Sequence, residues 1–126
     1  MKALVIALAA LATSPAYAFD VVARCQQSDY VTVDGNTRIA FAGSSYTPKC
    51  ITIKKGTTVT IAASTVHPLQ GILAADGSAN PIFDDLGGAV QNKTVTFDEA
   101  GIFGYYCVAH SDDQGNGMAG AIQVVE

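Results

Sequence analysis

Apolar and polar residues alternate with a period of two along several short stretches of this chain. Residues 51–61 show the pattern best: Ile51, Ile53, Val59 and Ile61 occupy one set of positions, threonines occupy the other, and residues 54–56 form a turn signal. Residues 93–97 and 120–125 repeat the alternation. A period of two is typical of β-strands with one buried and one solvated face. These stretches therefore predict strands.

The remaining segments predict more strands and little helix. Asp34-Gly35-Asn36 separates runs at 30–33 and 37–41, and an Asp-Gly pair supplies the positive φ that a hairpin turn requires. Helical periodicity is poor except at residues 81–88, where residues 84–86 are expected to form one turn of helix. Seven to eight short strands with glycine-rich turns in about 100 residues indicate an all-β Greek-key β-sandwich. This fold class alone gives no function.

The first 18 residues have a composition of their own. Lys2 is followed by an apolar run at residues 3–12 and then by residues 14–18 (SPAYA). A charged start, a short apolar middle and an Ala-x-Ala end are the parts of a secretory signal peptide. The run is shorter than the ~20 residues of a membrane-spanning helix, and no cysteine follows Ala18 directly to carry a lipid. We therefore expect residues 1–18 to be a signal peptide, residues 19–126 to be one exported domain, and no membrane anchor.

The charge balance narrows the classes of partner. The chain has 7 basic and 11 acidic residues, for a formal net charge of −4. The sequence contains no cluster of Lys or Arg that could neutralise phosphates, so we expect no nucleic-acid binding. An acidic exported domain suits small ligands, metals or basic protein partners better.

The chain has three cysteines, which cannot all pair with one another. Disulfides persist in exported proteins, and the sensible pairing joins Cys25 to Cys50 and leaves Cys107 as the odd thiol. Closing this loop is expected to stabilise the fold by roughly 3–4 kcal/mol through the unfolded state. The alternative is that Cys25 and Cys50 are simply buried thiols.

Four side chains carry the candidate chemistry. Residues 19–126 contain two histidines, one methionine and the odd cysteine, and three of these four fall in the spacing Cys107-x2-His110-x7-Met118. His67 lies 40 residues before Cys107. Two imidazoles, a thiolate and a long thioether contact are the ligands of a blue-copper site. Such a set lies between the geometries that Cu(I) and Cu(II) prefer, so little has to move when an electron arrives.

The sequence resembles the small cupredoxins of the plastocyanin, pseudoazurin and amicyanin kind. The matching stretches are residues 46–56 (YTPKCITIKKG), His67, residues 100–107 (AGIFGYYC) and residues 117–124 (GMAGAIQV). The resemblance implies a cupredoxin-like sandwich with one type 1 copper ion.

The resemblance also implies a role for each of the four side chains. His67, Cys107 and His110 would be the strong equatorial ligands, and Met118 would be the weak axial one. The ring edge of His110 would be the exit of the electron at the surface.

Three features depart from the family pattern. The segment between His110 and Met118 is longer and more polar than in those relatives, which leaves Gln114 or water as alternative axial ligands. Asp112 and Asp113 would stand beside an apolar patch made by residues 68–69 and 108–109, and we expect a basic partner to dock there unless these are only solvated loop charges.

The third departure is Pro68. In relatives, the residue after the first histidine donates a backbone N–H to the cysteine sulfur, and proline has no such donor. A lost hydrogen bond leaves more electron density on the thiolate, which favours Cu(II). We therefore expect Pro68→Asn to raise the reduction potential.

The function that these residues favour is a periplasmic one-electron carrier, expected to be a monomer and not an enzyme. Its partners would be redox proteins with a basic docking face, such as a c-type cytochrome or a copper enzyme. The first alternative is a periplasmic copper carrier or scavenger without an electron-transfer role. The others are a thiol hydrolase with Cys107 activated by His110, and a metal-free adhesion sandwich.

Overall fold

A computed structural model describes residues 19–126 of the chain. The predicted signal peptide, residues 1–18, lies outside the described residues. Within the described part, no helix has both the length and the apolar character needed to cross a membrane.

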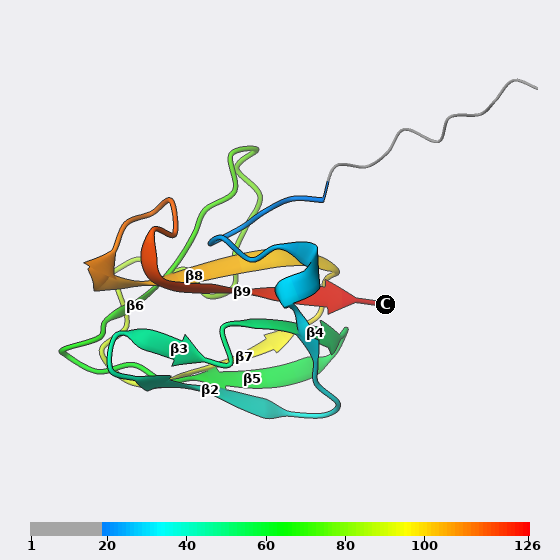
Figure 1. Ribbon diagram of the computed structural model, residues 1–126, viewed down its shortest axis with the longest axis horizontal. Helices are drawn as coiled ribbons and strands as arrows, with labels where there is room; N and C mark the ends of the chain where they lie inside the picture. Colours follow the sequence, from blue (N-terminus) through cyan, green and yellow to red (C-terminus); the bar gives the residue numbers. More distant parts are fainter. Residues whose placement is uncertain (1–18) are drawn as a thin grey trace, which may run out of the picture.

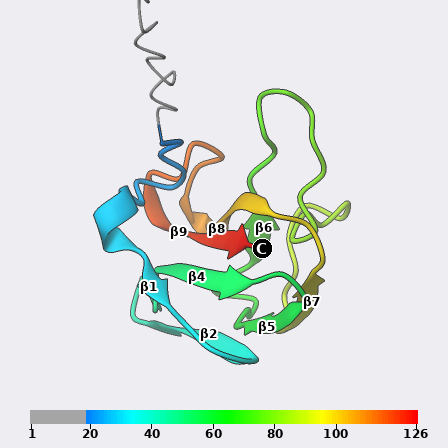
Figure 2. The ribbon, with the colours of Figure 1, turned by 90° about the vertical axis from the view of Figure 1, so that its right-hand side faces the viewer.

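The strands of residues 19–126 form two mixed sheets that pack face to face (Figures 1 and 2). The first sheet has the order β1 (Val31–Thr32), β4 (Cys50–Lys54), β9 (Gly117–Val125), β8 (Gly101–Ser111) and β6 (Leu69–Gly71). The second has the order β3 (Ser45–Thr47), β2 (Thr37–Ala42), β5 (Thr57–Ile61) and β7 (Lys93–Phe97). A short 3-10 helix, η1 (Gln27–Asp29), precedes β1.

The predicted all-β sandwich is confirmed, with nine strands in the described residues where seven to eight were expected. β3 and β6, which lie outside the predicted strands, have only three residues each. A strand that short shows no alternation, so the sequence pattern could not reveal it.

The alternation over residues 51–61 is confirmed in the core between the sheets. Ile51, Ile53, Val59 and Ile61 are all buried, although β4 and β5 belong to different sheets. On the outer face of the second sheet, threonine hydroxyls pair across β5 and β7 at Thr58–Thr96 and Thr60–Thr94. The period of two therefore sorts these residues correctly into core and surface.

The predicted hairpin over residues 30–41 is wrong. β1 pairs in parallel with β4, whereas β2 pairs with β3 and β5 in the other sheet. Gly35 does have positive φ (79°), so the turn chemistry is present, but the turn links two sheets. Ile39 is completely buried in β2. A turn sequence permits a change of direction, while distant strands decide which sheet each segment joins.

The predicted helical turn at residues 84–86 is also wrong, because this segment forms turns instead. The Asp84 side chain accepts a hydrogen bond from the Leu86 N–H (2.8 Å), and the Gln70 side chain bonds both the N–H and the carbonyl of Asp84. These side-chain bonds compete with helical ones.

The predicted disulfide between Cys25 and Cys50 is confirmed, with the two Cα atoms 5.9 Å apart. It ties the N-terminal segment to the start of β4. The two half-cystines form a small buried cluster with Ala121, on which Val22, Tyr30 and Ile102 pack.

Candidate metal centre

β8 carries two of the four candidate side chains. These two are Cys107 and His110. Cys107 points into the sandwich, as does Tyr105 two residues before it, and both side chains are fully buried. The pairing of β8 with β9 then shifts register between Tyr106 and Ser111. Such an irregularity redirects side chains, and His110, which lies within it, is exposed. Cys107 is the free cysteine of the described residues.

The loop after β8 is closed by its own polar residues. Asp112 accepts hydrogen bonds from the N–H (3.1 Å) and side-chain amide (3.2 Å) of Asn116 and from the N–H of Gln114 (3.0 Å), and these bonds, those from Asn116 most of all, lower the pKa of the Asp112 carboxyl. Arg24 donates from Nε and Nη2 to Asn116 Oδ1 at 3.0 and 2.8 Å. Gly117 returns the chain to β9 with a φ of 114°, at a point where a side chain would collide with the His110 carbonyl. Asp112 therefore has a structural role as well as a charge.

His67 is held by a tight turn beyond β5. Its N–H donates to Ser64 Oγ, and its carbonyl accepts from the Ser64 N–H, both at 3.1 Å. The ring of Phe41 packs against the His67 imidazole with centroids 4.5 Å apart. These contacts orient the ring toward the end of β8.

The structure brings His67, Cys107 and His110 together. The two imidazole Nδ1 atoms are 3.2 Å apart, and Cys107 Sγ lies 3.6 Å from Nδ1 of His67 and 3.4 Å from Nδ1 of His110. A point about 2.0 Å from all three atoms follows from these separations. Transition-metal bonds to imidazole and thiolate are ~2.0–2.3 Å long. The cluster therefore fits one metal ion, and its mix of nitrogen and soft sulfur suits copper.

Met118 and Gln114 differ sharply as candidates for the axial position. Met118 is 2% exposed and belongs to the same buried cluster as Cys107. Gln114 is exposed, and its side chain donates to Asp113 Oδ1 (3.4 Å) at the surface of the loop. Burial in the core cluster that contains the cysteine favours Met118 over Gln114.

The surroundings of the Cys107 sulfur are poor in hydrogen-bond donors. Pro68 follows His67 and has no N–H, and its carbonyl accepts from the Val108 N–H (2.9 Å). Among residues 19–126, the hydrogen-bonding neighbours of Cys107 Sγ are the two imidazole nitrogens and no backbone N–H.

The expected apolar patch differs in composition from the prediction. Leu69 is completely buried because it starts β6 and pairs with Cys107. Val108 is 42% exposed, Ala109 is exposed and Pro68 is half-buried, and Gly88 in the following loop lies against Val108 and Pro68. Backbone hydrogen bonds between Leu69 and Ala89 hold the two segments together. We call Pro68, Val108, Ala109 and His110 the His110 face.

Sequence reasoning missed the residues that orient the ligands. Ser64 stands three positions before His67, which is a spacing that allows a side-chain turn. Asp112, read only as a charge, begins a segment rich in Asn, Gln and Gly that is typical of such turns. Phe41 carries no local signal, since its contact with His67 is long-range.

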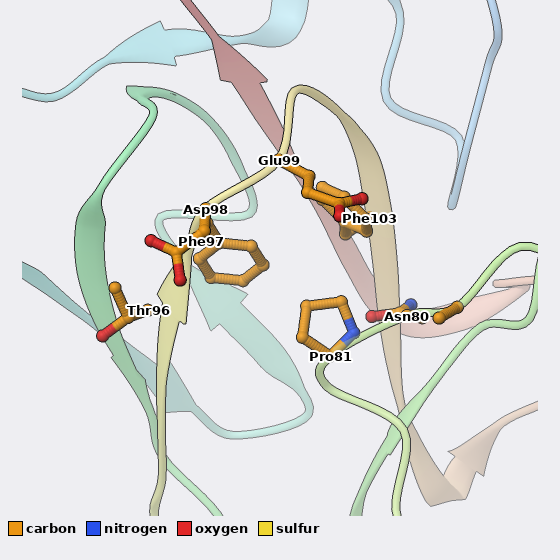
Figure 3. Close-up of a pocket in the computed structure, with 8 residues that line it drawn as sticks. Asn80, Pro81, Thr96, Phe97, Asp98, Glu99 and Phe103 are labelled. Carbon is orange, nitrogen blue, oxygen red and sulfur yellow. The ribbon is translucent and has the colours of Figure 1, made fainter.

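A pocket of about 280 Å³ lies toward the other end of β8 (Figure 3). Phe97 and Phe103 contribute rings 5.6 Å apart, Asp98 and Glu99 stand at its edge, and Asn80 lies opposite. The Asn80 amide is fully engaged with backbone groups of residues 72, 82 and 104. The pocket includes none of the four candidate ligands.

Comparison with known proteins gives one family and several similar structures. Residues 31–125 match the family model described as copper binding proteins, plastocyanin/azurin family. A pseudoazurin from Sinorhizobium meliloti is 26% identical, with a TM-score of 0.51 over 75% of this chain and 76% of that chain. No curated protein matches the sequence.

Two other structures show the same fold. A plastocyanin from Dryopteris crassirhizoma is 17% identical, with a TM-score of 0.53 over 70% of this chain and 99% of that one. A copper-containing nitrite reductase from Thermus scotoductus SA-01 is 19% identical, with a TM-score of 0.55 over 79% of this chain. The present chain spans only 28% of the length of that reductase.

Proposed function

Because this chain belongs to the plastocyanin/azurin family of copper-binding proteins, we propose that it is a type 1 (blue) copper protein that carries single electrons between periplasmic redox partners. The observation that carries the proposal is the convergence of two imidazole nitrogens and one thiol sulfur from distant parts of the chain. Copper bound there supplies exchange between Cu(I) and Cu(II).

The chain contributes a rigid set of ligands. Cys107 lies in a strand paired on both sides, His67 is fixed by Ser64 and Phe41, and His110 lies just before the loop closed by Asp112. Side chains held in this way need little rearrangement when the charge at the centre changes. We propose Met118 as the axial ligand, supported by its burial in the core cluster that contains Cys107.

The His110 face is the proposed docking surface. It places the exposed imidazole of His110 among apolar side chains that can exclude water from a contact. Asp112 and Asp113 are exposed beside it. A redox partner with a basic face, such as a c-type cytochrome or a copper enzyme, would be attracted there and then pack against the apolar centre.

We propose that the chain acts as a monomer and is not itself an enzyme. A thiol hydrolase requires its nucleophile to reach a substrate, but Cys107 is completely buried. The likeness to nitrite reductase covers only a minor part of that enzyme. Export to the periplasm is supported by the composition of residues 1–18 and by the Cys25–Cys50 disulfide, which persists in oxidising compartments.

The test is spectroscopy and voltammetry of the copper-reconstituted protein. We expect a strong visible thiolate-to-copper band and reversible one-electron reduction, both lost in Cys107→Ser. Met118→Leu should change the band and the potential, while Gln114→Ala, its control, should leave both unchanged. A copper-bound protein that cannot be reduced reversibly would favour the carrier or scavenger alternative, and a colourless product would contradict the proposal.

A further inference from the structure

Two tyrosine hydroxyls in residues 19–126 are buried without a hydrogen-bond partner, and they belong to Tyr30 and Tyr46. Leaving a buried hydroxyl unpaired generally destabilises a protein by roughly 1–3 kcal/mol. Phenylalanine would fill nearly the same space without that penalty. An unpaired hydroxyl in the core therefore calls for a reason.

Tyr46 is a core residue of β3, and its cross-strand neighbour contacts one of the candidate ligands. It is 4% exposed and pairs across β2 and β3 with Phe41, whose ring packs on His67. Its own ring meets Tyr105 edge-on, with centroids 4.8 Å apart. Tyr105 precedes Cys107 by two residues on the inward side of β8, and the cluster around Tyr46 contains both Cys107 and Met118.

Tyr30 occupies a different region. Its ring contacts Phe19 (5.7 Å between centroids) and packs on the cluster of Cys25, Cys50 and Ala121. Burial and, to a lesser extent, Asp29 raise the pKa of Tyr30 to about 12. The two hydroxyls therefore have the same hydrogen-bond status but different neighbours.

The Tyr46 hydroxyl stays protonated in this core. Burial raises the pKa of Tyr46 well above 10. Tyr46 is therefore a neutral hydroxyl at ordinary pH, with its proton in place. Electrostatic interactions across a core of low dielectric constant are stronger than those across water. The sulfur also lacks any backbone donor among the described residues, since Pro68 has none to offer.

We propose that Tyr46 is a positioning residue of the metal centre, whose hydroxyl dipole stabilises negative charge on the Cys107 sulfur and so raises the reduction potential. This inference rests on the proposed function. With its hydrogen turned toward the sulfur, the O–H bond would lower the electron density that the thiolate shares with a bound metal, and this would favour the reduced state. The buried, unpaired hydroxyl is then kept for its effect on the sulfur rather than for stability.

The experiment compares Tyr46→Phe with Tyr30→Phe in the copper-loaded protein. Each variant removes one buried, unpaired hydroxyl and keeps the ring, so the two are matched. We expect Tyr46→Phe to lower the reduction potential and shift the energy of the thiolate-to-copper band, while Tyr30→Phe leaves both as in the wild type. The midpoint of unfolding of the metal-free protein should stay the same or rise in both variants, since no hydrogen bond is lost.

A Tyr46→Phe protein with the wild-type potential, with a higher potential, or with a shift equal to that of Tyr30→Phe would overturn the inference. If Tyr46→Phe does not fold, Tyr46→Met, which also lacks the donor, is measured in its place under the same criteria. The wild-type band and potential are recorded first. A wild type with a reversible blue site and an unshifted Tyr46→Phe refutes only this inference, while a wild type without such a site refutes the proposed function.

Discussion

The two ends of β8 border two very different sites, a pocket and the candidate metal centre. Toward the start of the strand, Phe103 lines a pocket of about 280 Å³ whose carboxylates, Asp98 and Glu99, face solvent (Figure 3). Toward its end, Cys107 and His110 meet His67 with donor atoms 3.2–3.6 Å apart. The pocket offers space without converging ligands, and the metal end offers converging ligands. Chemistry at a metal site depends on lone pairs aimed at one point, so cavity volume is a poor guide to it.

Neighbouring residues also hold the side chains of the metal end more firmly than those of the pocket. Its ligands are held by Ser64, Phe41 and the closed loop at Asp112, whereas the edge of the pocket consists of exposed side chains. Preorganisation of this kind is what a centre needs if it is to change charge with little movement. The comparison can be tested by changing one residue at each end.

The largest contrast is expected between His67→Ala and Phe103→Ala. His67→Ala removes one of three converging donors, so the visible band and reversible reduction should be lost. Phe103→Ala should keep the spectrum and lower the free energy of unfolding by about 2 kcal/mol, since the ring is half-buried. Absorption spectra and urea unfolding of both variants test this. A blue His67→Ala protein would contradict the assignment of His67.

Removing the disulfide should lower the stability of the fold without changing the copper site. The Cys25→Ala/Cys50→Ala double variant is expected to lower the free energy of unfolding by roughly 3–4 kcal/mol, because the unfolded chain gains freedom. The copper spectrum of the folded fraction should stay as in the wild type, since neither cysteine contributes a donor atom to the cluster. A changed spectrum would mean that the N-terminal segment shapes the metal end.

Pro68→Asn should raise the reduction potential. The new N–H can donate to the Cys107 sulfur, and a difference of about 1 kcal/mol between oxidation states corresponds to roughly 40 mV for one electron. Pro81→Ala, at the pocket, is the control and should leave the potential unchanged. Voltammetry under identical conditions decides, and a lower potential in Pro68→Asn would show the reasoning about the sulfur to be wrong.

The charges at the two ends should differ in their effect on docking. Asp113→Asn is expected to slow association with a basic c-type cytochrome by about two- to five-fold at low salt, with the difference vanishing at high salt. Asp98→Asn removes the same charge at the pocket end and should change the rate little. Stopped-flow kinetics at several ionic strengths measure this. A wild-type rate that is independent of salt would exclude electrostatic steering at the His110 face.

The smallest effect concerns Asp76, in the loop between β6 and β7. Its carboxylate accepts hydrogen bonds from the Ser78 hydroxyl (2.6 Å) and N–H (2.9 Å), which hold its pKa below the usual 3.8. A depressed folded pKa means that the contribution to stability is present above the unfolded pKa and is lost as the pH falls through the lower folded value. An NMR titration should show this low pKa, and Ser78→Ala should bring it back toward 3.8. An unchanged pKa in Ser78→Ala would point to another cause.

Much of the site could be predicted because the types of its residues already indicate which metal they bind. The two histidines, the odd cysteine and the single methionine of residues 19–126 indicated copper by identity and order, and the structure brings His67, Cys107 and His110 together. The supporting contacts could not be predicted in the same way. Phe41 contacts His67, and Tyr46 contacts Tyr105 of β8, only because β2 and β3 belong to the sheet that packs against the one containing β8.

The sequence by itself determined which residues of the alternating stretches face inward. The alternation over residues 51–61 depends on the period of a strand, which is a local property of the backbone. Only the tertiary structure decided which sheet each strand joins, and so it separated the expected hairpin at residues 30–41 and buried Leu69. The physical reason is that strand partners are chosen by long-range packing and hydrogen bonding, which no local pattern encodes.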